Sequence, residues 1–360
     1  MDDAAYMRRA LELARRAEGS VSPRPPVGAL VVAGDEVAGE GFTKPVPGPH
    51  AEAEALEAAG SRARGATLYV TLEPCTRSSV SVSCADRILD SGLRRVVAAT
   101  RDPNPDVNGR GFRAIRRAGI DVRTGVLRAP ARALIEPFAK WITTARPFVT
   151  LKLAMSLDGK VAAPDGSSRW ITGELARAEV HDLRRRVDAI VVGAGTVEAD
   201  DPLLTFRLSG IEGTQPLRVV IDSSGRTRPG ARIFDDSAPT LVLGAFDIPG
   251  HVTEAWTRHR AAVAALPRAD GGVDLAAALG ELGRRGVCHV LVEAGPTLAG
   301  SFADAGLVDR YIFYIAPKLI GGDAPGVFAT GVKTLADAWE LDVTNTRRVG
   351  ADIRVDARPR

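Results

Sequence analysis

Hydrophobic and polar positions follow two different periods along the first third of the chain. Apolar residues recur at helical spacing over residues 2–18 and predict an amphipathic helix, which the prolines from Pro23 onward interrupt. Apolar runs over 27–32 and 66–72 predict buried strands, and a Gly-Asp turn pairs the first of them with 36–41 in a hairpin.

The same pattern continues with short helices between further strands. An Ala- and Glu-rich stretch over 51–59 that ends at Gly60 predicts one helix, and Cys84 begins another that ends at Gly92. The remaining elements expected in this half are a strand at 95–99, a helix ending at Gly119, a strand from Ile120 and a helix over about 130–141. Strands that alternate with helices predict an α/β layer structure.

The alternation restarts after residues 143–147, so we expect a domain boundary there and two domains, 1–145 and 146–360. The second domain is also α/β. Its expected strands cover residues 148–155, 189–192, 217–221, 240–243, 261–266, 287–292 and 308–315, and its expected helices cover 174–187, 275–285 and 297–305.

Composition restricts the function classes. The chain of 360 residues has a net charge of +3 and only 5% aromatic residues, which disfavours a base-stacking surface and a nucleic-acid partner. It has no apolar run long enough to span a membrane, and its acidic N-terminus is unlike a secretory signal. With only three cysteines, a disulfide framework is not expected, and we predict a cytoplasmic protein.

The candidate chemistry in the first domain is a zinc site. The order His50, Glu52, Cys75 and Cys84 supplies one imidazole and two thiolates, which can hold Zn²⁺ and leave its fourth position open for water. Glu52 is then the carboxylate that moves protons, as in the zinc deaminases. A structural zinc would need a fourth protein ligand, and spacing alone leaves open His181, His251, His259 and His289.

Two glycine-bearing turns follow strands in the second domain. They lie at 193–196 and 295–300, where a strand, a glycine turn and a helix can present backbone N–H groups to a phosphate. The first turn does not complete G-x-G-x-x-G because Glu198 occupies the last position. These turns therefore predict a nucleotide or phosphate site without indicating which ligand it binds.

Longer stretches carry a family resemblance. The segments 49–52, 70–75 with Cys84, and 102–105 resemble the deaminase half of the bifunctional riboflavin-biosynthesis deaminase/reductases. The second half of the chain is similar to the reductase half of that family in six segments, 151–159, 168–172, 195–202, 220–223, 293–300 and 315–318. These segments occur in the family's order and cover nearly the whole chain.

The resemblance implies two activities. Domain 1–145 would have the three-layer cytidine-deaminase fold and hydrolyse the 2-amino group of 2,5-diamino-6-ribosylamino-4(3H)-pyrimidinone 5′-phosphate. Domain 146–360 would have a dihydrofolate-reductase-like fold and use NADPH to reduce the ribosyl chain to ribityl. A homo-oligomer, either a dimer or a tetramer, is also implied, with a small-molecule pyrimidine as the only required partner.

The resemblance also assigns site residues. It makes His50, Cys75 and Cys84 the zinc ligands and Glu52 the proton shuttle. The implied NADPH contacts are Ala154, Trp170, Thr196, Asp200, Ser223, Gly295, Pro296, Thr297, Leu298, Ala299 and Gly300. The implied substrate contacts are Ser168, Arg184, Leu204, Arg207 and Glu293. Taken singly, Trp170 could be a core residue, Arg184 and Arg207 surface charges, and Asp200 a turn residue.

Four positions depart from the family pattern in the deaminase half. Arg24 stands where the family usually has Asn, Thr43 stands where a His is common, and Arg77 and Val80 occupy an altered segment between the cysteines. Three explanations stay open: a different pyrimidine substrate, the usual substrate with its phosphate on Arg24 and Arg77, or a weak deaminase beside a working reductase. A nucleic-acid-editing deaminase, a metal-stabilised scaffold and a preference for NADH over NADPH are further alternatives.

Overall fold

The computed structural model describes residues 2–76, 82–210, 213–270 and 272–360. It divides into two compact units, Met1–Arg146 and Pro147–Arg360, one residue after the boundary expected from the sequence. Both units are α/β, as the alternating periods predicted. In the described residues, no helix has the length and apolar character that a membrane crossing requires.

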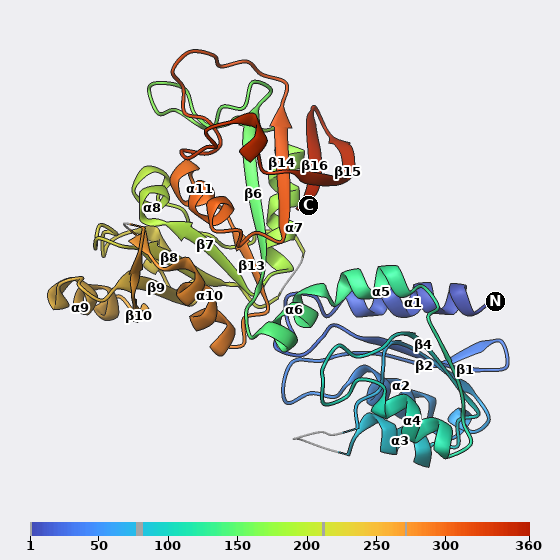
Figure 1. The fold of residues 1–360 in the computed structure, drawn as a ribbon. Coiled ribbons are helices and arrows are strands. Elements are labelled where there is room, and N and C mark those ends of the chain that lie inside the picture. Colours follow the sequence, from blue (N-terminus) through green and yellow to red (C-terminus); the bar gives the residue numbers. More distant parts are fainter. Residues whose placement is uncertain (1, 77–81, 211–212, 271) are drawn as a thin grey trace. The chain divides into compact units, whose positions relative to one another are not determined.

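The first unit contains a five-stranded sheet (Figure 1) in the order β2-β1-β3-β4-β5. Strand β1 is antiparallel to β2 and β3, whereas β3, β4 and β5 are parallel to one another. The strands are β1 (Gly28–Ala33), β2 (Glu36–Phe42), β3 (Thr67–Leu72), β4 (Arg95–Thr100) and β5 (Asp121–Thr124).

Helices cover both faces of this sheet and make three layers. Its helices are α1 (Asp3–Arg15), α2 (Ala51–Ala59), α3 (Cys84–Asp90), α4 (Arg110–Arg117), α5 (Arg128–Leu134) and α6 (Glu136–Thr144). Figure 1 shows α1 and α5 on one face and α2, α3 and α4 on the other. Because successive strand residues point to opposite faces, Leu30 packs in the cluster under α1 while Val31 packs in the cluster under α2.

Helix α2 lies directly on strand β2. A Cβ atom at Gly41 would lie 2.3 Å from the carbonyl oxygen of Ala51, so only glycine permits this approach. The contact fixes the first turn of α2, which carries His50 and Glu52. Gly60, with a φ of 52°, ends the helix as predicted.

The single helix expected over 130–141 is wrong, because the structure contains two helices there. Helix α5 ends at Leu134 and α6 begins at Glu136, with Pro137 in the first turn of α6. A proline has no N–H to donate and its ring collides with the preceding turn, so a helix cannot run through it undisturbed. One helix therefore ends before Ile135 and a second begins after it.

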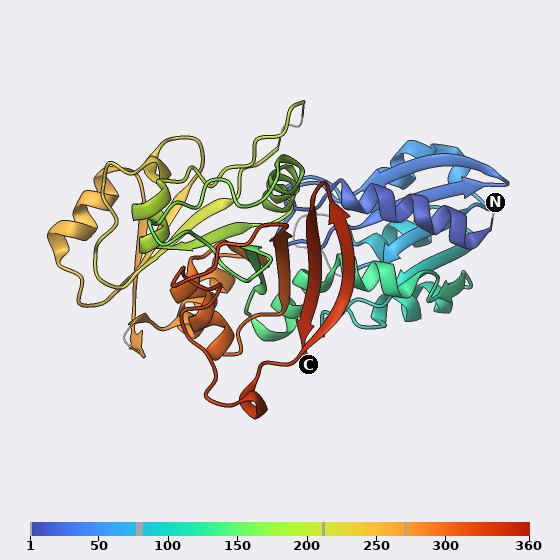
Figure 2. The same ribbon diagram turned by 90° about the horizontal axis from the view of Figure 1, so that it is seen from above.

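The second unit contains a nine-stranded sheet in the order β10-β9-β8-β7-β13-β6-β14-β16-β15. The first seven strands in this order are parallel, and β16 and β15 add an antiparallel hairpin at one end, drawn in red in Figure 2. The strands are β6 (Phe148–Ser156), β7 (Ala189–Gly193), β8 (Leu217–Asp222), β9 (Thr240–Ala245), β10 (Ala262–Leu266), β13 (His289–Val292), β14 (Arg310–Ala316), β15 (Leu341–Val349) and β16 (Asp352–Pro359). A separate small hairpin joins β11 (Arg268–Ala269) to β12 (Gly272–Val273).

The helices of this unit connect its parallel strands. They are α7 (Glu174–Arg185), α8 (Ala194–Asp200), α9 (Gly250–Arg258), α10 (Leu275–Arg284) and α11 (Pro296–Asp304). Both sequence-predicted glycine turns are helix starts, since Gly193 caps α8 and Gly295 caps α11. The sequence pattern did not predict α8, α9, the β11–β12 hairpin or the β15–β16 hairpin.

Candidate active sites

The first candidate site lies where α2, the end of β3 and α3 meet. His50 is the N-cap residue of α2, Cys75 follows β3 after the Glu-Pro pair, and Cys84 is the first residue of α3. The ligand atoms of the three side chains all lie within 4.8 Å of one another. Nδ1 of His50 is 3.3 Å from Sγ of Cys84 and 3.7 Å from Sγ of Cys75.

These distances fit a zinc ion. With Zn–N and Zn–S bonds of the usual lengths and tetrahedral angles, a nitrogen and a sulfur ligand stand about 3.5 Å apart. Both nitrogen–sulfur separations are close to that value. Within the described residues the group has three members, which leaves one position of a tetrahedral ion to water or substrate.

The start of helix α3 helps to hold the first thiolate. The backbone N–H of Cys84 donates to Sγ of Cys75 at 3.4 Å, and the N–H of Ala85 donates to the carbonyl oxygen of Cys75 at 3.0 Å. Hydrogen bonds from the Cys84 thiol and from His50 lower the pKa of Cys75 to about 4. The bond to Cys75 and burial raise the pKa of Cys84. A cation that binds both sulfurs must therefore displace one proton.

Glu52 is buried beside this group, with only 4% of its surface exposed. Burial, followed by the negative charge of Cys75, raises the pKa of Glu52 to about 7. A cation in the site would lower that pKa again, because it favours the carboxylate. A buried carboxyl group next to the open metal position is placed to take up a proton from water and to return it.

Glu73 is a residue that sequence reasoning did not single out. Its buried carboxylate accepts hydrogen bonds from the backbone N–H groups of Asp102 (3.3 Å), Gly109 (2.8 Å) and Phe112 (3.3 Å). These bonds attach the loop after β4 and the start of α4 to the chain just before Cys75. The position of Glu73 directly before Pro74 and Cys75 was the sequence feature that could have identified it.

The departures from the family pattern have structural roles where they are described. The half-buried guanidinium of Arg24 donates from Nη1 to the carbonyl oxygens of Gly48 (2.7 Å) and Lys44 (3.3 Å), in the loop before His50. Thr43 is buried and pairs with Val27. Arg77 and Val80 lie outside the described residues, so the binding of a phosphate by Arg24 and Arg77 stays a prediction.

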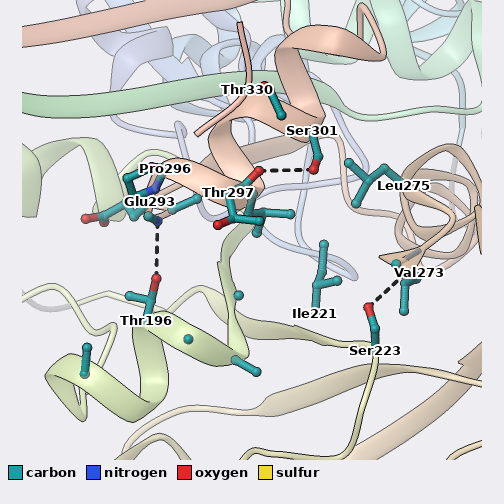
Figure 3. Close-up of a pocket in the computed structure, with 18 of the residues that line it drawn as sticks. Thr196, Ile221, Ser223, Val273, Leu275, Glu293, Pro296, Thr297, Ser301 and Thr330 are labelled. Carbon is teal, nitrogen blue, oxygen red and sulfur yellow. Dashed lines mark hydrogen bonds between the residues drawn. The ribbon is translucent and has the colours of Figure 1, made fainter. Parts of the chain in front are cut away.

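The second candidate site is a pocket of about 1270 Å³ in the second unit (Figure 3). It follows the carboxyl ends of the parallel strands, where ligands bind in open α/β sheets. Most of the residues assigned by resemblance line it: Ala154, Ser168, Arg184, Thr196, Asp200, Leu204, Ser223, Glu293, Gly295, Pro296, Thr297 and Leu298.

Four of the assigned residues are not among its lining. Trp170 is 62% exposed and stacks against Arg177, and Arg207 bonds to Thr205. Ala299 is fully buried inside α11, and a Cβ at Gly300 would lie 2.3 Å from Oγ1 of Thr330. Ala299 and Gly300 thus contribute to the packing of α11. Contacts of Trp170, Arg207, Ala299 and Gly300 with a bound ligand remain predictions.

One end of the pocket contains an ionic triad whose side chains are only 9–15% exposed. Glu293, just after β13, accepts bonds from Arg184 of α7 at 2.6 and 3.1 Å and pairs with Lys152 of β6 at 3.2 Å. Burial alone would raise the pKa of Glu293, but the charges and bonds of Arg184 and Lys152 lower it to about 2. Because the triad has two cations and one anion, this end of the pocket carries a net positive charge, which suits an anionic ligand. Lys152 was not predicted.

The middle of the pocket is the start of α11. The first N–H groups of a helix have no partner within it, and Gly295, Pro296, Thr297 and Leu298 line the pocket, so the positive end of α11 faces the pocket. The N–H of Gly295 donates to Oγ1 of Thr196 at 3.3 Å, which joins α11 to α8 (Figure 3). This arrangement fits the phosphates of a dinucleotide.

Comparison with protein families gives a match for each unit. Residues 147–355 match the RibD C-terminal domain. Residues 1–100 match the cytidine and deoxycytidylate deaminase zinc-binding region.

Similar full-length proteins and structures agree with these matches. The chain is 41% identical to riboflavin biosynthesis protein RibD of Escherichia coli K12 over 98% of both chains, and 40% identical to that of Bacillus amyloliquefaciens over 99% of this chain and 96% of the other. A structure of Acinetobacter baumannii RibD has a TM-score of 0.90 at 35% identity, with 99% of each chain covered. A diaminohydroxyphosphoribosylaminopyrimidine deaminase/5-amino-6-(5-phosphoribosylamino)uracil reductase from Thermotoga maritima has a TM-score of 0.88 at 36% identity, again covering 99% of each chain.

Proposed function

The chain belongs to the RibD family of bifunctional riboflavin-biosynthesis enzymes, and on that premise we propose which of its residues carry out the two reactions. The enzyme is a zinc-dependent deaminase with a cytidine-deaminase-like fold joined to an NADPH-dependent reductase with a dihydrofolate-reductase-like fold. The single observation that supports the deaminase assignment best is the His50/Cys75/Cys84 group with Glu52 buried beside it.

In the deaminase, His50, Cys75 and Cys84 hold the ion, and the N–H of Cys84 at the start of α3 donates a hydrogen bond to the sulfur of Cys75. Zinc, when bound, supplies a Lewis acid that acidifies a water molecule at its fourth position. Glu52 takes a proton from that water and returns a proton to the leaving amino group of the pyrimidinone.

In the reductase, NADPH supplies the hydride that converts the ribosyl chain to ribityl. The start of α11 binds the dinucleotide phosphates through the N–H groups of Thr297 and Leu298. Arg184 and Lys152 bind the anionic substrate, and Glu293 keeps both cations fixed in the pocket.

Two further properties belong to this proposal. Among the described residues, Cys75, Cys84 and Cys288 form no disulfide, which favours a reducing compartment such as the cytoplasm. Strand β15 ends the sheet, and its side chains are mostly exposed, Val343 among them. An edge strand presents unpaired backbone N–H and C=O groups, which offers one surface for the homo-oligomer, either a dimer or a tetramer, that the proposal includes.

Turnover of the diamino-ribosylaminopyrimidinone phosphate tests the function directly. Ammonia release and NADPH oxidation are followed separately in the same sample. We expect ammonia release without NADPH, and NADPH oxidation only after deamination or with pre-deaminated substrate. Release of no ammonia from any zinc-loaded sample, with NADPH oxidation intact on pre-deaminated substrate, would reject the deaminase assignment for this pyrimidine.

Replacing Cys84 with Ser is expected to remove the bound zinc and the deaminase activity together. A serine hydroxyl is a much weaker zinc ligand than a thiolate, and two protein ligands do not hold the ion. Metal analysis of the purified full chain measures the effect. The matched control is Cys288→Ser, a buried cysteine of the second unit, which should retain one zinc per chain. Unchanged zinc content in the Cys84 variant would contradict the ligand assignment.

A further inference from the structure

Two loops that line the reductase pocket leave the sheet side by side. Strands β6 and β14 are parallel neighbours with Ser156 opposite Ala316, so the loops that follow them, residues 157–168 and 317–330, start at adjacent points. Figure 1 and Figure 2 show the first loop in green next to the second loop in orange-red. The loop residues that line the pocket are Val161, Ala162, Gly166, Ser168, Pro325 and Thr330.

Backbone hydrogen bonds join the two loops at two places. The N–H of Leu157 donates to the carbonyl oxygen of Lys318 at 2.9 Å, and the N–H of Val161 donates to that of Pro325 at 3.1 Å. Residues 320–324 lie between these two contacts. Side chains of the first loop bind this segment.

The carboxylate of Asp158 binds two N–H donors of the segment 320–324. It accepts the backbone N–H of Ile320 at 3.2 Å and that of Gly321 at 2.7 Å. The hydroxyl of Ser156 donates to the same carboxylate at 2.5 Å and orients it. The bond from Ser156, followed by that from Gly321, lowers the pKa of Asp158 to about 2, so the acceptor is ionised at neutral pH.

The ammonium group of Lys160 binds two carbonyl acceptors of the same segment. Its Nζ donates to the carbonyl oxygens of Gly322 at 3.2 Å and Ala324 at 2.8 Å. Gly321 and Gly322 have positive φ angles of 70° and 57°, a conformation that glycine adopts without strain. Asp158 and Lys160 therefore bind the donors and the acceptors of one short turn, and hydrogen bonds to charged groups are stronger than those between neutral groups.

We propose that Asp158 and Lys160 are positioning residues of the reductase, which join the two loops into one cap over the bound substrate. The inference rests on the proposed reductase function. The first loop continues β6, the strand of Lys152, and it ends at Ser168, so the ligand beside the cap is the substrate. Asp158 and Lys160 are not among the residues that line the pocket, so they act through the loops that they hold. A cap that is already ordered costs the ligand less conformational entropy on binding than two separate loops would.

The opposite charges of the two residues separate positioning from electrostatic attraction. If the residues acted through charge alone, loss of the Lys160 cation would weaken the binding of a phosphate-bearing substrate, and loss of the Asp158 anion would strengthen it. If they act by joining the loops, both losses weaken binding. The variants Lys160→Met and Asp158→Asn make this comparison, because each keeps the approximate size of the side chain and removes its charge.

Hydrogen–deuterium exchange of the full-length protein, followed by mass spectrometry, tests whether the loops are joined. Both substitutions lie in the first loop, and we expect each to make the amides of residues 317–326 in the second loop exchange at least ~5-fold faster. Lys160→Arg, which can still donate to both carbonyl oxygens, should retain the exchange of the wild type. The matched control is Lys333→Met, which removes an exposed lysine that follows the second loop and should change nothing.

Steady-state NADPH oxidation on pre-deaminated substrate tests the effect on binding. We expect Lys160→Met and Asp158→Asn each to raise the KM of the pyrimidine substrate by about 10-fold and to change kcat by less than about twofold, because neither residue touches the reacting atoms. Lys160→Arg should restore the KM of the wild type. Ammonia release should be the same in all variants, since both residues belong to the second unit.

The possible results separate this inference from the reductase assignment. Unchanged exchange of the second loop in both variants overturns the joining of the loops, and faster exchange with an unchanged KM overturns the positioning role. A higher KM in Lys160→Met with a lower KM in Asp158→Asn shows an effect of charge, which also overturns it. In all three cases the wild type still oxidises NADPH. A wild type that oxidises no NADPH on pre-deaminated substrate would reject the proposed reductase function and this inference together.

Discussion

Replacing Glu52 with Gln is expected to lower ammonia release by ~10²–10⁴-fold and to leave NADPH oxidation on pre-deaminated substrate unchanged. The amide has nearly the same shape as the carboxyl group but cannot take a proton from water at neutral pH. Glu52 lies buried in the first turn of α2, and no residue of the reductase pocket comes from that unit. Steady-state assays of the two products on one preparation measure both effects.

A second glutamate of the same helix provides the control. Glu57 lies on the exposed side of α2, so Glu57→Gln should retain both activities. Zinc content should stay at one per chain in both variants, because neither residue belongs to the ligand group. Parallel loss of ammonia release and NADPH oxidation in Glu52→Gln would argue against two separate sites.

Replacing Glu293 with Gln is expected to destabilise the reductase unit by about 3–5 kcal/mol and to abolish NADPH oxidation. The change leaves the largely covered cations Arg184 and Lys152 without a counter-charge, and unpaired charge with little access to water is costly. Urea unfolding followed by tryptophan fluorescence reports on this unit, because three of the four tryptophans, Trp170, Trp256 and Trp339, belong to it.

The same variant should change the acid sensitivity of folding. The pKa of Glu293 is lowered from 4.5 to about 2 in the folded chain. The contribution of the Glu293 carboxylate to the free energy of unfolding is therefore fully present above pH 4.5 and is lost as the pH falls towards 2. The stability gap between wild type and variant should narrow over that range.

Glu281→Gln is the matched control for this experiment. Glu281 also pairs with two arginines, Arg284 and Arg285, but both are partly exposed and can return to water. Its replacement should cost less than about 1 kcal/mol. A stability loss in Glu293→Gln no larger than in the control would contradict the role given to the triad of Glu293, Arg184 and Lys152.

Local sequence patterns predicted the deaminase site because its parts are short-range features. The helix that carries His50 and Glu52 shows in its alanines and its terminal Gly60, and Pro74 ends the strand before Cys75. Their approach in space was an expectation from the zinc chemistry, and the structure brings the three ligand atoms together.

Features that depend on long-range pairing were not predicted. Lys152 looks like an ordinary polar position of a strand, and it meets Glu293 only because β6 and β13 pair in the sheet. Strand β15 has a polar, exposed sequence without the apolar alternation of a half-buried strand, so the pattern gave no signal for it. The break at Ile135 could be predicted only if the helix-breaking effect of Pro137 were given more weight than the helical spacing of the apolar residues.

X-ray absorption at the zinc edge of the full-length enzyme measures the ligand set itself. His50, Cys75 and Cys84 predict one zinc per chain with two sulfurs at about 2.3 Å and two nitrogen or oxygen neighbours at about 2.0–2.2 Å. The Cys84→Ser protein should lose that spectrum. A coordination shell without sulfur, or an unchanged spectrum in the variant, would contradict the catalytic zinc site.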